Sequence, residues 1–160
     1  MKQIRIGIIA TLALAFISSP LVAAPKEGSY KSDGCFHGQH FMTAHSKDAM
    51  GGSYTGISSQ SASGEGDFWR NTVGRCNGAW TLIMGEVNES GTCEYTDAAG
   101  DKFFGIYTRK NQDGTWKVLG GTGKYDGIES TGTWSPYTQF PAIQGEVATC
   151  FHQTGKYKLK

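Results

Sequence analysis

The sequence lacks the charge pattern of a nucleic-acid-binding protein and the apolar runs of a membrane-spanning one. Basic and acidic residues number 15 and 14, and because Lys2 and Arg5 lie in a leader segment, 13 basic residues remain beyond it. Without a basic excess the chain has little with which to neutralise phosphate backbones, so no nucleic acid partner is expected. The apolar run from Ile6 to Ile17 is shorter than the roughly 20 residues that a spanning helix needs, so no membrane span is expected either.

Motifs of familiar catalytic and cofactor sites are also missing. The chain has no G-x-S-x-G elbow, no H-E-x-x-H pair and no EF-hand spacing. Gly123-Lys124 looks like part of a phosphate loop, but Val118 and Tyr125 stand where that loop needs Gly and Ser or Thr. Asp97 and Asp101 are interpreted as turn residues, with a calcium site as the alternative. We therefore expect no cofactor.

The first 24 residues have the pattern of a signal peptide. Lys2 and Arg5 form a basic start, an apolar run follows, and Ser18 to Ala24 is a small-residue exit. Cleavage is expected between Ala23 and Pro25, and no cysteine at the exit offers a lipid anchor. We therefore predict a leader over residues 1–24 and a single domain over residues 25–160, exported to the periplasm or secreted.

The composition of the remainder favours an all-β fold. Glycine, at 23 of 160 residues, is about twice as frequent as usual, and 12% of residues are aromatic. This mixture is typical of short, bulky strands joined by tight turns. In the last segment Phe151, Tyr157 and Leu159 share one parity and a row of lysines shares the other, which predicts one buried and one wet face. A closed antiparallel up-and-down barrel fits this pattern, although the spacing alone also permits a sandwich.

Individual elements are expected as follows. Strands are predicted over residues 35–43, 53–60, 103–109, 115–121 and 145–159. A polar lead-in (25–33), a separator (46–52), a mobile Ser/Gly-rich loop (58–66) and a loop at 136–141 are expected between or before them. Asp97–Gly100 has the residues of a type I turn, and Asp113-Gly114 is a hairpin signal.

Residues 74–95 predict a hairpin in a defined register. A two-residue turn at Met84-Gly85 sets Cys76 opposite Cys93 and Trp80 opposite Glu89. The face that carries these pairs is mostly apolar, whereas the other face is polar and pairs Arg75 with Glu94, as a correct register should. Trp80 and Tyr95 are then expected to point inward. A longer loop through residues 88–91 is the competing register.

The segment between Trp116 and Trp134 carries a family resemblance. An apolar strand runs into Gly120-Gly-Thr-Gly-Lys-Tyr125, and Gly127-Ile128 and a Thr/Gly/Trp strand follow. This run resembles the GGTGKY-x-G-I-x-G-x-G segment of the allene oxide cyclase-like (dirigent-like) β-barrels, including their uncharacterised secreted bacterial members. The resemblance implies a barrel of eight strands. It also implies that trimers occur among similar proteins, and that plant members are cyclases.

The four cysteines are expected to form two disulfides, because an exported chain folds in an oxidising compartment. The hairpin register favours Cys76–Cys93, which leaves Cys35–Cys150 to tie the first strand to the last. Because His37 and His152 stand two residues from Cys35 and Cys150, the alternative is a Cys2His2 site for zinc or copper.

Two functions from different classes stay open at this point. The first is a non-catalytic barrel that binds a small apolar molecule or serves as a scaffold, with cavity-lining aromatics, or plain core residues, at Trp80, Tyr95, Tyr107 and Trp116. The second is a cofactor-independent cyclase or isomerase acting on a hydrophobic substrate. Glu89 is then the catalytic candidate, because desolvation on the apolar face would raise its pKa; the alternative places Glu89 in water at the rim.

Self-association is a further expectation. Phe103 and Tyr107 lie on one face of their strand, and Phe104 and Ile106 lie on the other. One face must fill the barrel, so the second is either covered by a loop or used to form a homo-oligomer.

Overall fold

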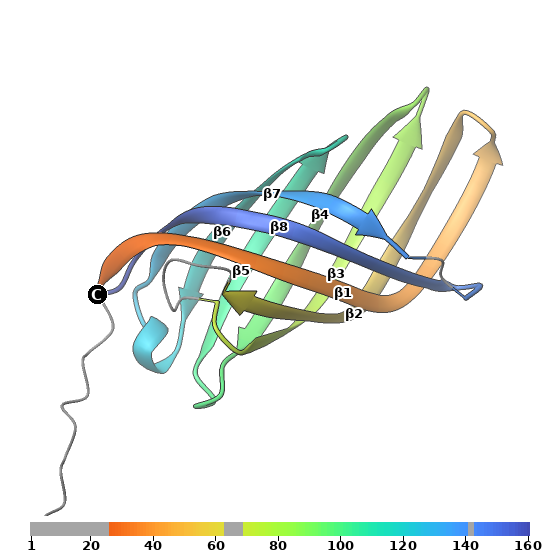
Figure 1. The fold of residues 1–160 in the computed structure, drawn as a ribbon. Coiled ribbons are helices and arrows are strands. Elements are labelled where there is room, and N and C mark those ends of the chain that lie inside the picture. The colour runs from red at the N-terminus through yellow and green to blue at the C-terminus, as the bar shows by residue number, and fades with distance from the viewer. Residues whose placement is uncertain (1–25, 63–68, 141–142) are drawn as a thin grey trace, which may run out of the picture.

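The computed structural model describes residues 26–62, 69–140 and 143–160, so the predicted leader and its predicted cleavage site lie outside the described residues. Eight antiparallel strands form a closed barrel in which each strand pairs with its neighbours in sequence and β1 also pairs with β8 (Figure 1). The predicted fold class is therefore confirmed. The strands are β1 (Glu27–Ser46), β2 (Ala49–Ala62), β3 (Thr72–Ile83), β4 (Glu86–Thr96), β5 (Lys102–Lys110), β6 (Asp113–Gly121), β7 (Glu129–Gln139) and β8 (Glu146–Lys158).

The β3–β4 hairpin has the predicted register. Cys76 pairs with Cys93, Trp80 with Glu89, and Arg75 with Glu94. Inward and outward positions alternate along both strands, as the pleat of a β-strand requires. Met84 and Gly85 form the turn with φ values of 51° and 85°. A non-glycine residue in this left-handed region is uncommon, so the hairpin keeps its register despite an unfavourable turn residue.

Several predicted loops are in fact strand. β1 begins at Glu27 and includes most of the expected lead-in, and β2 begins at Ala49, inside the expected separator. β2 continues to Ala62, so the first part of the expected Ser/Gly-rich loop is paired; residues 63–66 lie outside the described residues. β7 likewise extends to Gln139. Pairing with neighbours on both sides overrides the low β-propensity of these segments.

The two predicted turns have different outcomes. Asp97–Gly100 is a turn, because Gly100 N donates to Asp97 O at 3.0 Å. The β5–β6 hairpin exists, but its turn is at Asn111 and Gln112, two residues before the predicted position, and Lys110 pairs with Asp113. Asn111 has a φ of 53°, a conformation that Asn tolerates better than most residues.

Both expected disulfides are present, and they lie on opposite sides of the barrel wall. Cys35–Cys150 joins β1 to β8 with Cα atoms 4.0 Å apart, on the outer face. Cys76–Cys93 joins β3 to β4 with Cα atoms 4.1 Å apart, on the inner face. Because Cys35 and Cys150 are bonded to each other, they offer no thiolates for the alternative metal site, and no free cysteine remains.

An aromatic cluster fills one end of the barrel. Trp69 is completely buried at its centre, and its ring lies 4.9–5.8 Å from four aromatic rings of the barrel wall: Tyr30, Tyr95, Phe103 and Trp116. Edge-to-face contacts of this kind add to the free energy gained from burial. Phe104 and Ile106 instead point outward and are each 38% exposed, so β5 has apolar side chains on both faces, as predicted. Homo-oligomer formation stays a prediction.

The segment from Gly120 to Ile128, which carries the family resemblance, covers this same end of the barrel. Its residues Gly123–Tyr125 form a short 3-10 helix, η1, which lies against the β4–β5 turn. Lys124 Nζ is 2.6 Å from Asp97 Oδ2, and Tyr125 Oη donates to the same oxygen at 3.3 Å. Asp97 Oδ1 accepts from the backbone N–H groups of Ala99 and Asp101. Asp97 and Asp101 therefore organise this end of the barrel through protein contacts.

The described part of the chain contains no helix long and apolar enough to cross a membrane.

We predict that the Cys35–Cys150 disulfide stabilises the barrel more than Cys76–Cys93 does. The first links residues 115 apart in sequence and the second links residues 17 apart. In the chain-entropy model the two are worth about 5 and about 3 kcal/mol. Thermal unfolding of the double Cys→Ser variants measures the difference, with His37→Ala as an unaffected control. A larger loss from removing Cys76–Cys93 would contradict the prediction.

We also predict that Asp97→Asn destabilises the protein in a pH-dependent way. Burial alone would raise the pKa of Asp97, but hydrogen bonds from Lys124 and from two backbone N–H groups outweigh it and lower that pKa. The stabilisation is therefore complete above the unfolded pKa, about 4, and is lost as the pH falls through the lower folded value. Denaturant unfolding should show a loss of about 1–3 kcal/mol near neutral pH that shrinks in acid. A loss independent of pH would contradict this.

Candidate functional site

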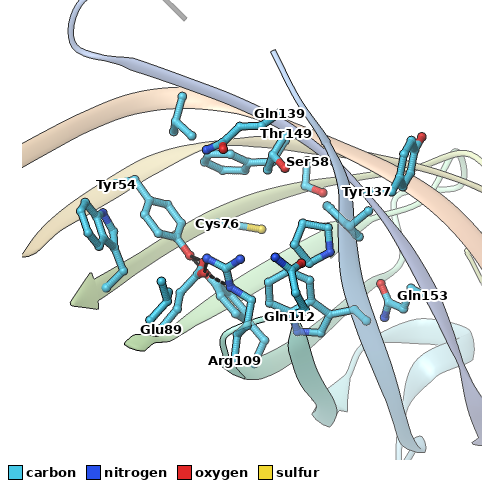
Figure 2. A pocket seen from close by; sticks show the side chains of 18 of the residues that line it. Tyr54, Ser58, Cys76, Glu89, Arg109, Gln112, Tyr137, Gln139, Thr149 and Gln153 are labelled. Atoms are coloured by element: carbon cyan, nitrogen blue, oxygen red, sulfur yellow. Dashed lines mark hydrogen bonds and ion pairs between the residues drawn. The ribbon is translucent and has the colours of Figure 1, made fainter. Parts of the chain in front are cut away.

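The other end of the barrel is hollow. A cavity of about 780 Å³ extends inward from the hairpin turns at Gly85 and at Asn111-Gln112 (Figure 2). Its wall is mainly aromatic and aliphatic, with contributions from Phe36, Trp80, Val87, Trp134, Val147 and Phe151. The inner-face disulfide Cys76–Cys93 also lines it. The interior is therefore packed at one end and open at the other.

Glycines help to keep this space free. Gly78 and Gly91 face each other across β3 and β4, and the Tyr107 side chain lies over both. A Cβ at Gly91 would come within 2.2 Å of Tyr107 Oη, and one at Gly78 within 2.5 Å. Larger residues at these positions would push Tyr107 into the cavity.

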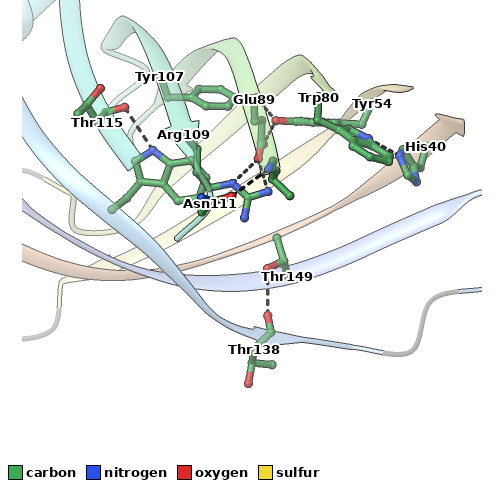
Figure 3. A network of polar contacts seen from close by, with 12 residues as sticks. His40, Tyr54, Trp80, Glu89, Tyr107, Arg109, Asn111, Thr115, Thr138 and Thr149 are labelled. Atoms are coloured by element: carbon green, nitrogen blue, oxygen red, sulfur yellow. Dashed lines mark hydrogen bonds and ion pairs between the residues drawn. The ribbon is translucent and has the colours of Figure 1, made fainter. Parts of the chain in front are cut away.

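A charged and hydrogen-bonded cluster is built into the cavity wall (Figure 3). Glu89 Oε1 accepts a hydrogen bond from Tyr54 Oη, and Glu89 Oε2 lies 2.6 Å from both Nε and Nη2 of Arg109. Tyr54 Oη also lies 2.6 Å from Tyr107 Oη. The Arg109 guanidinium is 5.6 Å from the centre of the Trp134 ring, within the range of a cation–π contact. These four polar side chains come from β2, β4 and β5.

The two tyrosines of this cluster stay protonated. Burial raises the pKa of Tyr54, and the nearby negative charge of Glu89 raises it further. Burial likewise raises the pKa of Tyr107. Since Glu89 is ion-paired with Arg109 and its side chain is only 11% exposed, the cluster presents a buried, charge-neutral group of four side chains.

A second polar pair lies near the mouth of the cavity. Trp80 Nε1 donates to His40 Nε2 at 2.6 Å (Figure 3). An indole nitrogen can only donate, so His40 Nε2 must act as the acceptor, and the hydrogen of the neutral ring is on Nδ1. Both side chains line the cavity.

All the residues named from the sequence as ligand-binding or catalytic line this cavity. They are Trp80, Glu89, Tyr95, Tyr107 and Trp116. Their position is thus established, whereas their roles remain predictions. Tyr95 and Trp116 also belong to the aromatic cluster, so they form the inner boundary of the cavity. Glu89 lies in the wall rather than in water at the rim.

Tyr54 and Arg109 were missed by sequence reasoning. Arg109 pairs directly with Glu89 across β4 and β5, and Tyr54 pairs with Gly78 across β2 and β3. The missing signal for Arg109 was the register of β4 with β5, which depends on the length of the turn between them. Tyr54 lies in a Gly/Ser-rich segment that gave little indication of which face it presents.

The two histidines beside the outer disulfide point away from the cavity. His37 Nε2 lies 3.1 Å from Glu146 Oε2, and His152 Nδ1 lies 2.6 Å from Asp33 Oδ1. Each is therefore engaged with a different carboxylate across the β1–β8 pairing. Among the described residues no group of three or more His, Cys, Asp or Glu side chains could hold a metal ion.

Comparison with known proteins returns structures only. No family model and no curated protein match the sequence. Among solved structures, the pterocarpan synthase dirigent protein GePTS1 is 14% identical with a TM-score of 0.49, over 91% of this chain and 99% of that chain. The pterocarpan synthase dirigent protein PsPTS1 is 14% identical with a TM-score of 0.47, over 85% and 97%. The barrel assignment rests on the pairing of this chain's own eight strands.

Proposed function

We propose that the protein is an exported β-barrel that binds a small, largely apolar molecule in its cavity. The observation that carries this proposal is the hollow, aromatic-lined end of the barrel. Eight-stranded barrels have room for side chains or for one small ligand. Pockets for small molecules measure about 300–1,000 Å³, and this cavity, at about 780 Å³, falls within that range.

Export and family membership are part of the same proposal. Two disulfides indicate that the chain folds in an oxidising environment, and the leader pattern of residues 1–24 supplies a route to one. We place the chain with the exported bacterial branch of the allene oxide cyclase-like barrels on the strength of the segment from Gly120 to Ile128.

We predict that a larger side chain in the cavity wall weakens binding of a neutral apolar dye. N-phenyl-1-naphthylamine, whose fluorescence rises in apolar surroundings, is the probe. Val147 lines the cavity, so Val147→Trp should weaken dye binding by about tenfold or more, or ~1.4 kcal/mol. Val73 is 53% exposed on the outside of β3, so Val73→Trp is the matched control and should bind normally. Equal binding by both variants, or none by the unmodified protein, would contradict the proposal.

A second function is favoured by one specific observation. Glu89 and Tyr54 form a hydrogen-bonded pair in the cavity wall, among largely apolar side chains. A carboxylate next to a protonated hydroxyl can take a proton from a substrate and return it elsewhere. This arrangement supports the alternative of a cofactor-independent cyclase or isomerase acting on a hydrophobic substrate, with Glu89 as the catalytic group.

Under this alternative, the protein should accelerate proton exchange in a bound carbon acid. The probe is 4-phenylbutan-2-one in deuterated water, with loss of the hydrogens next to the carbonyl followed by NMR. Glu89→Gln should lower the rate by about 100-fold or more. Glu94→Gln changes an outer carboxylate of the same strand and should leave the rate unchanged. Exchange no faster than in buffer would count against the enzyme and leave the binding proposal intact.

A further inference from the structure

The Arg109 side chain has one edge that its ion pair does not use. A guanidinium group carries N–H donors along both its side edge and its outer edge. Glu89 Oε2 lies 2.6 Å from both Nε and Nη2, so the ion pair occupies the side edge. The outer edge, formed by Nη1 and the second hydrogen of Nη2, takes no part in this contact. Because the Arg109 side chain is 21% exposed and lines the cavity (Figure 2), a bound molecule can approach the outer edge.

The other polar groups of the same cluster are engaged within the protein. Glu89 Oε1 accepts a hydrogen bond from Tyr54 Oη, and Glu89 Oε2 accepts from Arg109. Tyr107 Oη lies within hydrogen-bond distance of both Tyr54 Oη and Asn77 O. The hydroxyl hydrogens and both carboxylate oxygens therefore have partners. The N–H groups on the outer edge of Arg109 are the donors that this cluster offers to a bound molecule.

The charges around this edge favour an uncharged acceptor. Glu89, with a side chain only 11% exposed, already balances the positive charge of Arg109. Among the described residues that line the cavity there is no second Lys or Arg. A ligand carboxylate would be a second negative charge beside one guanidinium, and no further cation would offset the cost of its desolvation. A carbonyl oxygen accepts from the same N–H groups without adding a charge.

The position of Arg109 sets the direction in which a ligand lies. Arg109 stands just before the turn at Asn111-Gln112, where the cavity opens. Its guanidinium lies over the Trp134 ring, 5.6 Å from the ring centre. Farther inside, the wall is formed by buried groups that include Trp116 and the Cys76–Cys93 disulfide. A molecule held at Arg109 by its polar end therefore places its apolar part against the inner wall.

We propose that Arg109 anchors an uncharged hydrogen-bond acceptor, such as a ketone or ester carbonyl, of an otherwise apolar ligand. The carbonyl oxygen accepts from the outer edge of the guanidinium near the mouth, and the apolar body extends toward Trp116. A charged donor makes a stronger hydrogen bond than a neutral one, and the surrounding apolar wall strengthens it further. This proposal rests on the proposed binding function and names the class of the ligand and the residue that recognises it.

Displacement of N-phenyl-1-naphthylamine by three ligands of nearly equal shape tests this assignment. They are 4-phenylbutan-2-one, which has the carbonyl, butylbenzene, which has no acceptor, and 3-phenylpropanoate, which has a carboxylate. Because loss of Arg109 alone would leave Glu89 as an unpaired charge, the test variant carries both Glu89→Gln and Arg109→Met. This variant should bind the ketone about tenfold more weakly. Its affinity for butylbenzene should be nearly unchanged, because the hydrocarbon makes no such bond.

The matched control carries both Glu86→Gln and Lys110→Met. It removes the Glu86–Lys110 ion pair, which joins the same two strands on the exposed surface, so ketone affinity should not change. Glu89→Gln alone keeps Arg109 and should bind the ketone more tightly than the test variant does.

An infrared measurement on the unmodified protein does not depend on any variant folding. With a carbon-13 label in the carbonyl, the C=O stretch of the bound ketone should lie below its frequency in hexane, because the hydrogen bond to Arg109 weakens the C=O bond. A stretch at the hexane frequency would show that the carbonyl has no donor in the cavity.

The outcomes separate this inference from the function on which it rests. A loss confined to the ketone in the test variant, with a lowered C=O stretch in the unmodified protein, supports the inference. If the ketone loses no more affinity than butylbenzene, if the carboxylate binds as tightly as the ketone, or if the stretch is that in hexane, the inference is wrong and the binding function stands. If neither the dye nor any of the ligands binds the unmodified protein, the binding function itself is contradicted.

Discussion

The pairing of β1 with β8 is the constraint on which the rest of the structure depends. It runs from Glu27 opposite Lys158 to Gln39 opposite Glu146, and it converts a sheet with two open edges into a barrel without any (Figure 1). Once the barrel is closed, every strand has two neighbours, so even the Ser- and Gly-rich β2 is held extended. Closure also creates an interior, which the chain then fills unevenly. The Cys35–Cys150 bond lies within this pairing and makes it covalent.

Because side chains fill the interior unevenly, the two ends of the barrel differ: one is packed and the other is hollow. At one end Trp69 and the rings around it occupy the interior, and the Asp97–Lys124 contact holds η1 against the β4–β5 turn. At the other end glycines replace large side chains, and the remaining aromatics line the wall rather than fill the centre. Burial of these rings stabilises the barrel at the first end, whereas the second end remains hollow. A charge-neutral cluster in the wall keeps the hollow end polar in places without giving it a net charge.

The parts of this structure that could be predicted are those in which both of two paired strands carry a clear pattern in their own sequence. The β3–β4 hairpin was predictable because cysteines equidistant from one turn, together with an apolar and a polar face, admit few registers. That register placed Trp80, Tyr95 and Glu89 inside. β1 and β2 were underestimated, because their small polar residues are extended only through pairing with distant strands. Arg109 reaches Glu89 through the register of a third strand, which a two-strand pattern does not contain. The cavity could not be predicted either, because it depends on the summed volumes of side chains from all the strands around the barrel.

The position of the Gly120–Ile128 segment has a consequence for how the cavity can be altered. Residues from Gly120 to Ile128 belong to the packed end, and none of them lines the cavity. The GGTGKY run therefore helps to hold the packed end, whereas the cavity wall is built from other segments of the chain. The residues that would contact a bound molecule can therefore be changed without altering the segment that packs the opposite end.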